Sequence, residues 1–145
     1  MNLKMLRAGE LLALSGAICL GVSLFEPWYH GIVGKLNLWD TFGPAAMLLL
    51  VALAGALTMV AGALTERSTA LPVSSAVWCV LLGWVGVVAA IVRLLDTPEH
   101  ANRLSIGPWL ALAGTIAIAV GAWEALRDER QSLYGPVEPE PRARP

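Results

Sequence analysis

Four long apolar stretches dominate the sequence, and each is close to the length that a helix needs to cross a lipid bilayer. They cover residues 8–25, 44–64, 71–95 and 108–126. About 20 apolar residues span the hydrocarbon core, and backbone groups in lipid must bond within their own segment, so each stretch is predicted to be a helix. Only 14% of the residues are charged, against about 25% in soluble domains. The sequence therefore predicts an all-α, polytopic membrane protein with four transmembrane helices in an antiparallel bundle.

Prolines and charges mark the limits of these helices. Gly43-Pro44 and Gly107-Pro108 precede the second and fourth stretches, and proline suits the first turn of a helix because its missing N–H would be unpaired there. Residues 1–127 are predicted to form the transmembrane domain. In residues 128–145 charge and proline rise together, which predicts a short helical extension and then a disordered, extended cytoplasmic tail.

The basic residues predict the orientation of the chain. Seven of them fall on the side of the two termini and three on the other, with Arg93 counted at the end of its helix. Because cytoplasmic loops carry the excess of Lys and Arg, both termini are predicted to be cytoplasmic. The first stretch follows Lys4 and Arg7 but has no clear Ala-x-Ala site, so it is interpreted as an uncleaved helix. The predicted location is the cell (inner) membrane, with several crossings and with loops 26–43 and 96–107 outside.

The second and fourth stretches share a pattern. Ala52-Leu53-Ala54-Gly55 matches Ala111-Leu112-Ala113-Gly114 at an offset of 59 residues, and Gly62-Ala63 matches Gly121-Ala122 at the same offset. Two copies of a helical hairpin would explain the matches, and so would chance among Ala, Leu and Gly.

Small residues mark candidate packing faces on the helices. Ala113, Ala117 and Gly121 recur every four residues in the fourth stretch, and small residues let helix backbones approach closely in lipid. Packing within the bundle is the favoured interpretation, and contact between copies is the alternative. Substitution of Ala117 or Gly121 by leucine is expected to disturb assembly.

The loops on the predicted outer side hold a second candidate site. Its members are Trp28, His30, Trp39, Asp40, Arg93 and Asp96. Aromatic residues such as Trp28, Trp39 and Phe42 are also expected as a belt at the membrane–water boundary. Residues 30–38 alternate weakly and are predicted to form a hairpin around Gly34. Asp40 or Thr41 is a candidate cap for the second helix.

The charge of Arg93 has three candidate partners. Asp96 lies three residues further on the same helical face. An ion pair with Asp40 or Glu26 would instead hold the first loop against the end of the third helix. We interpret such a pair as structural.

Two carboxylates, Glu10 and Glu124, lie near the cytoplasmic ends of their helices. Arg7 and Arg127 each lie three residues away, so interfacial ion pairing is the favoured interpretation. The alternative is a small proton-coupled transporter that works as an oligomer. Small four-helix multidrug exporters resemble this chain in size and in the glutamate of the first helix, which in them sits well within the membrane, whereas Glu10 lies at its edge.

No metal, cofactor or catalytic motif stands out. Cys19 and Cys79 lie inside apolar runs, and His30 and His100 lack metal-ligand spacing. An enzyme or metal binder at the outer face would use both histidines with Asp40, Arg93 and Asp96. The net charge of −1 implies no attraction to nucleic acid. We therefore expect no cofactor and no metal.

Short motifs over most of the chain carry a resemblance to a family. They are Pro27-Trp28-Tyr29, Trp39-Asp40-x-Phe42, Arg93-x-x-Asp96-x-Pro98 and Gly107-Pro108-Trp109, with Ala- and Gly-rich helices and an Arg- and Pro-rich tail. In these the chain resembles small four-helix integral membrane proteins of actinomycete-type bacteria, a resemblance that implies the fold but no activity. The leading hypothesis is a non-enzymatic membrane protein that acts through helix–helix and outer-loop contacts. It would be an accessory subunit of a membrane-protein partner or would associate with itself.

Overall fold

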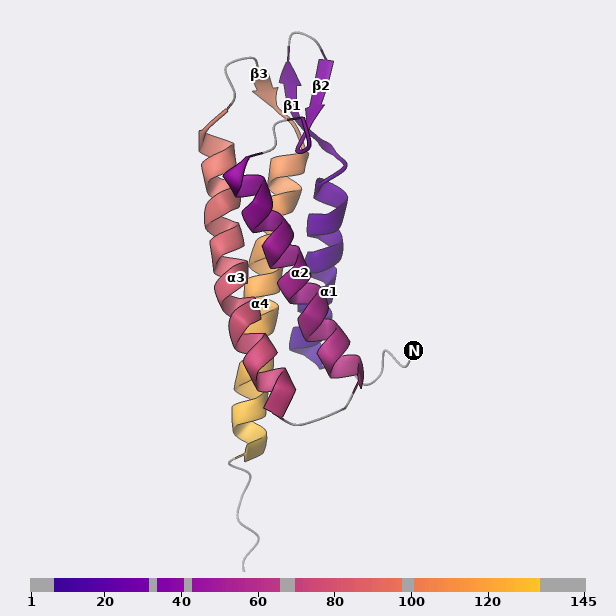
Figure 1. Ribbon diagram of the computed structural model, residues 1–145, viewed down its shortest axis with the longest axis vertical. Helices are drawn as coiled ribbons and strands as arrows, with labels where there is room; N and C mark the ends of the chain where they lie inside the picture. The colour runs from indigo at the N-terminus through magenta and orange to yellow at the C-terminus, as the bar shows by residue number, and fades with distance from the viewer. Residues whose placement is uncertain (1–6, 32–33, 41–42, 66–69, 98–100, 134–145) are drawn as a thin grey trace, which may run out of the picture.

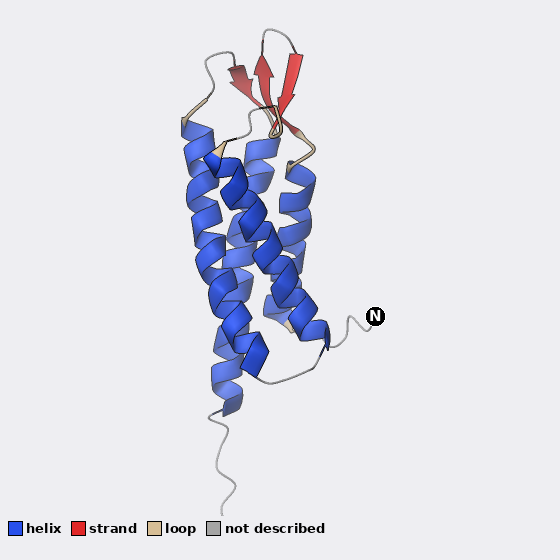
Figure 2. Ribbon diagram, viewed as in Figure 1, coloured by secondary structure: helices blue, strands red, loops and turns tan. Residues whose placement is uncertain are grey.

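The structure, a computed structural model, consists of four helices and a small sheet at one end of them (Figures 1 and 2). It describes residues 7–31, 34–40, 43–65, 70–97 and 101–133. The helices are α1 (Ala8–Ser23), α2 (Pro44–Thr65), α3 (Ala70–Leu95) and α4 (Gly107–Leu133), and the strands are β1 (Pro27–Gly31), β2 (Gly34–Asn37) and β3 (Ala101–Leu104). The predicted turn at 66–70 lies outside the described residues except for Ala70, where α3 begins, and the tail lies outside them from residue 134.

Three of the helices are long and apolar enough to cross a membrane. These segments are Pro44–Leu64, Ala76–Leu95 and Gly107–Asp128. The fourth, α1, has 16 residues and measures about 24 Å at 1.5 Å per residue. Helix α2 begins at Pro44 as predicted, and α4 continues past residue 126 to Leu133, in agreement with the predicted helical extension.

The first helix is shorter than the predicted segment 8–25, and its last turn shows why. In a continuing helix the Ser23 carbonyl would bond to residue 27, but that residue is a proline and has no N–H to donate. The indole N–H of Trp28 bonds this carbonyl instead, at 2.6 Å. The Leu24 N–H bonds back to the Gly21 carbonyl at 3.3 Å, which is the tightened geometry typical of helix ends. The chain then turns into β1.

The sheet lies where α1 and α3 end and where α2 and α4 begin (Figure 1). Its order is β2-β1-β3, and both pairings are antiparallel. Strands β1 and β2 form the hairpin predicted around Gly34, and this glycine has φ of 131°, a conformation that residues with a Cβ rarely adopt. Strand β3 was not predicted, because its four residues show no pattern of their own and gain their order by pairing with β1.

The closest helix contact joins α1 to α4. A Cβ built on Gly16 would lie 2.6 Å from the Gly114 carbonyl oxygen, and one built on Gly121 would lie 2.5 Å from the Ala13 nitrogen. Backbone therefore meets backbone, as small residues allow at membrane helix interfaces. Gly9 closes the same interface against Gly121 and Ala125.

The helix-packing residues of the sequence analysis divide over two faces of α4. Gly121 is buried against α1, and the Cβ of Ala117 would lie 2.9 Å from a Cβ on Gly16, whereas Ala113 is exposed. Helix α4 also packs along α3, and α3 along α2, while α1 and α2 share a smaller contact. The glycine contact therefore serves packing within the chain.

Candidate functional site at the sheet end of the helices

Trp28 holds the sheet onto the helices. Its side chain is fully buried, and its indole nitrogen bonds the end of α1 at Ser23. A Cβ on Gly107 would lie 2.5 Å from the Trp28 Cδ1 atom, so the ring lies flush against the first residue of α4. The Ser105 N–H donates to the Trp28 carbonyl at 3.0 Å. Trp28 thus joins α1, β1 and the start of α4, and its role is structural.

Tyr29 is the residue of this end that sequence reasoning missed. It is fully buried, and its hydroxyl donates to the carbonyl of Arg93 at 2.7 Å. Burial raises the pKa of the Tyr29 phenol, the Arg93 guanidinium opposes this rise, and the Asp96 carboxylate adds to it. Tyr29 therefore connects β1 to the end of α3. The signal in the sequence was the pair of adjacent aromatics after a helix end, which we had interpreted as part of a membrane belt.

The structure brings Arg93 and Asp96 together with Tyr29. Arg93 is half-buried and Asp96 is exposed, and both charges act on the phenol of Tyr29. The structural pairing of the Arg93 charge stays a prediction, and the contact shown is that of the Arg93 carbonyl with the Tyr29 hydroxyl. The group is a buried phenol with a cation and an anion beside it, and it positions β1.

Asp40 and Trp39 lie in the turn after β2. The Asp40 carboxylate accepts the backbone N–H of Asn37 at 2.8 Å, so this side chain closes the turn. Both residues are exposed. Thr41 and Phe42, the other candidates for the cap of α2 and for the aromatic belt, lie outside the described residues.

His30 is exposed in the middle strand of the sheet, where its register partners are Lys35 on β2 and Arg103 on β3. In the described part of the chain, no three His, Cys, Asp or Glu residues form a group that could hold a metal ion. His100 lies outside the described residues. The six predicted residues of this end therefore divide into two groups. Trp28 and the backbone carbonyl of Arg93 take part in bonds that hold the sheet to the helices, while His30, Trp39, Asp40 and Asp96 are exposed.

The two predicted coupling carboxylates have local partners at the other end of the helices. Glu10 accepts the backbone N–H of Arg7 at 2.9 Å, and this satisfies a free donor at the start of α1. Glu124 pairs with Arg127 at 3.3 Å. The Glu124–Arg127 ion pair thus forms as the spacing indicated, whereas the bond shown for Glu10 is to the backbone of Arg7 and not to its guanidinium.

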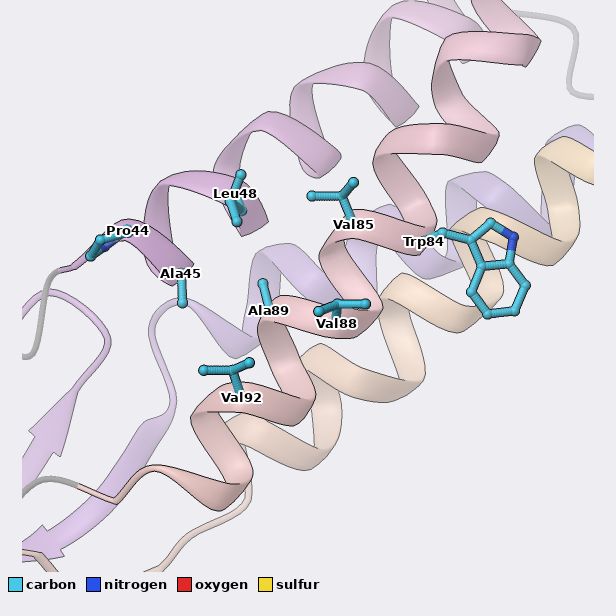
Figure 3. Close-up of a pocket in the computed structure, with 8 residues that line it drawn as sticks. All are labelled: Pro44, Ala45, Leu48, Trp84, Val85, Val88, Ala89 and Val92. Atoms are coloured by element: carbon cyan, nitrogen blue, oxygen red, sulfur yellow. The ribbon is translucent and has the colours of Figure 1, made fainter.

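An apolar groove runs between α2 and α3 and reaches the sheet end (Figure 3). Its volume is about 450 Å³. Its walls are Pro44, Ala45 and Leu48 from α2 and Trp84, Val85, Val88, Ala89 and Val92 from α3. Figure 3 shows side chains of the two helices facing each other, with Trp84 at the edge of the groove. Sequence reasoning missed the groove, because its α3 residues have the spacing of any apolar helix face.

Trp84 also borders a second hollow, between α3 and α4. This hollow has a volume of about 240 Å³ and is lined by Trp84, Ala119, Val120 and Trp123. Each of the two tryptophans has 55% of its surface exposed. Tryptophan concentrates at membrane interfaces, whereas Trp84 lies near the middle of α3. The α2–α3–α4 face thus combines two apolar hollows with a large aromatic side chain between them.

At the sheet end the buried side chains of Trp28 and Tyr29 bond neighbouring backbone carbonyls. The groove between α2 and α3 is lined by apolar side chains. No protein-family model, no curated protein and no solved structure matches this chain.

Proposed function

We propose that this chain crosses the cell membrane four times as an antiparallel bundle and works by contact, with the α2–α3 groove as its docking surface. Its partner is a transmembrane helix, either of another membrane protein or of a second copy. The groove carries the proposal, because it is a large hollow whose walls are apolar side chains of α2 and α3, and a tryptophan from the middle of α3 lies at its edge.

The crossing by α1 is supported by its surroundings. Apart from Ser15, its exposed side chains are apolar, with Ile18 61% exposed and Val22 48% exposed. Its other face meets α4 through backbone contact along its length at Gly9 and Gly16. At about 24 Å it is shorter than a hydrocarbon core of about 30 Å. Exposed Phe25 beyond its end adds apolar length, and a short helix is also accommodated by local thinning of the bilayer.

The orientation rests on the distribution of basic residues. The excess of Lys and Arg on the side of the termini favours a cytoplasmic location for both ends. The sheet then faces outward. Around the helix ends beside it lie exposed apolar side chains, among them Phe25, Leu95, Ile106 and Trp109. Such a ring is typical of the level at which hydrocarbon gives way to headgroups.

Packing explains how the groove would hold a helix. Helices associate in lipid through close contact, because lipid tails are as apolar as their side chains. Ala45 and Ala89 leave room between α2 and α3, and Leu48, Val85 and Val92 provide the walls. A partner side chain placed there would gain dispersion contacts that flexible acyl chains make less well. The tryptophan at the edge adds a large surface and one hydrogen-bond donor.

Filling the groove tests the proposal. Tagged full-length protein, wild type and variant, is purified from its own membranes in mild detergent and analysed by native mass spectrometry. Val88, which is 60% exposed, is replaced by tryptophan, a change that fills the groove without altering the core. Ile116→Trp is the matched control, since Ile116 is 43% exposed and lies outside both hollows.

The wild-type protein is expected to carry a stoichiometric partner chain or to form a defined oligomer, with Val88→Trp losing it and Ile116→Trp keeping it. A foreign chain in the complex identifies an accessory subunit, whereas copies of this chain identify self-association. A solitary wild-type chain, or a complex that survives Val88→Trp unchanged, would rule out the groove as the docking surface.

A further inference from the structure

The outward face of the sheet carries a row of basic side chains. His30 in the central strand is paired in register with Lys35 of β2 and with Arg103 of β3. All three residues are exposed. Because directly opposed residues in antiparallel strands project to the same face of a sheet, the three side chains stand side by side across all three strands.

The row places a cation on each side of the central histidine. Its register partners on the two neighbouring strands are Lys35 and Arg103. The ion pair shown between described residues is that of Glu124 and Arg127, at the other end of the helices. The carboxylate of Asp40, the nearest acid after β2, bonds the Asn37 N–H. The described structure therefore gives the row no anion of its own.

The spacing of the row suits one small anion. Adjacent strands lie about 4.8 Å apart, so the outer two residues are separated by about 10 Å with the imidazole between them. Long Lys and Arg side chains reach across such a gap from both sides. The guanidinium group of an arginine binds two oxygens of a phosphate group at once, and the ammonium group of a lysine contributes a point charge. The imidazole N–H of the histidine between them can donate a further hydrogen bond.

We propose that His30, Lys35 and Arg103 form a binding site for a phosphate group. The group belongs either to a soluble phosphate compound or to the headgroup of an anionic lipid. Arg103 lies three residues before Ile106 in the chain, and His30 lies five residues after Phe25. At about 3.3 Å per residue, the row lies roughly 10–16 Å beyond those two apolar side chains. At that distance the long side chains of Lys35 and Arg103 can reach either a soluble phosphate compound or a lipid headgroup.

Only the lipid source depends on the membrane crossing proposed above. A soluble phosphate compound would bind the row in any setting in which the sheet is folded. Two measurements separate the sources. In the first, full-length protein in nanodiscs of neutral phosphatidylcholine is titrated with inorganic pyrophosphate by calorimetry. In the second, native mass spectrometry counts phosphatidylglycerol molecules retained by protein from mixed nanodiscs.

The informative variant is His30→Glu, which places a carboxylate between Lys35 and Arg103. It is expected to lower the affinity at least tenfold while leaving the melting temperature unchanged or higher, because each cation then faces an opposite charge. Arg127→Ala removes one positive charge at the far end of the molecule and is the control, with binding equal to wild type. If His30→Glu fails to fold, Lys35→Gln combined with Arg103→Gln replaces it, since both side chains are exposed.

Binding in either measurement that is lost in His30→Glu and kept in Arg127→Ala supports the site and identifies its source. The absence of binding in both measurements overturns it, as does a His30→Glu protein that binds as well as wild type. An equal loss in Arg127→Ala also overturns it, because attraction would then follow total charge. None of these outcomes depends on whether a partner occupies the α2–α3 groove.

Discussion

Replacing Gly121 by alanine should loosen the contact between α1 and α4. The new Cβ would lie 2.5 Å from the Ala13 nitrogen and 2.6 Å from the Gly9 carbonyl oxygen. Both are backbone atoms, so no side-chain rotation can relieve the clash, and the helices must move apart by about 1 Å to restore contacts of about 3.5 Å. Overpacking of this kind costs typically about 1–3 kcal/mol, and we expect a loss of about 2 kcal/mol.

Gly21→Ala is the matched control. Gly21 also lies in a helix, but a Cβ built there meets nothing within 4 Å. Alanine favours a helix over glycine by up to about 1 kcal/mol, so this variant should be as stable as wild type or slightly more stable. Unfolding would be followed by circular dichroism in mixed micelles of mild detergent with increasing sodium dodecyl sulfate.

A double variant sharpens the test. The Cβ of an alanine at position 9 would press on the Gly121 carbonyl, just as the Cβ at position 121 presses on the Gly9 carbonyl. One separation of the helices relieves both clashes, so Gly9→Ala with Gly121→Ala should destabilise by less than the sum of the single changes. A Gly121→Ala protein as stable as Gly21→Ala would refute the close backbone contact.

Two further predictions concern the sheet end. Trp28→Phe keeps an aromatic ring but removes the donor to the Ser23 carbonyl, and the free energy of unfolding should fall by about 1–2 kcal/mol in the same detergent assay; Trp109→Phe, at an exposed position, should have little effect. Tyr29→Phe removes the bond to the Arg93 carbonyl and should cost about 1 kcal/mol. Because burial raises the pKa of Tyr29 above 10.0, the folded state holds the phenolic proton more tightly than the unfolded state. The stability that this adds is complete below pH 10.0 and is lost as the pH rises through the folded pKa. Unfolding measured between pH 8 and 12 should therefore show an alkaline decline in wild type that Tyr29→Phe lacks, and equal declines would contradict the assignment.

The helices were predictable from the sequence because their causes are local. Length and apolarity set the four segments, and Pro44 fixed the start of α2. Gly34 marked the hairpin in the same way, since few residues other than glycine accept its φ of 131°. The end of α1 was placed two residues too late, because its tightened last turn depends on how the chain enters β1, which is set by the fold.

The sequence of each helix taken singly could not predict which helices pack against one another. Gly9 and Gly16 are seven residues apart in α1, and Gly114 and Gly121 are seven apart in α4. The match can be seen once the two helices are known to meet, but the four-residue series of Ala113, Ala117 and Gly121 was equally regular. Ala113 belongs to the exposed surface. Strand β3 and the α2–α3 groove likewise arise from how separate segments approach one another.

The contact between α1 and α4 also sets an order of events during synthesis. Of the four described helices, the first to be synthesised has its most extensive contact with the one synthesised last. Gly16 and Gly114, which meet backbone to backbone, are about 100 residues apart, and at 5–20 residues per second the second of them is made roughly 5–20 s after the first. Throughout that interval the backbone of α4 is not yet available to pack against Gly9 and Gly16 of α1. Packing of α1 against its main neighbour therefore waits for the synthesis of α4, and a chain that stops before α4 leaves α1 without that neighbour.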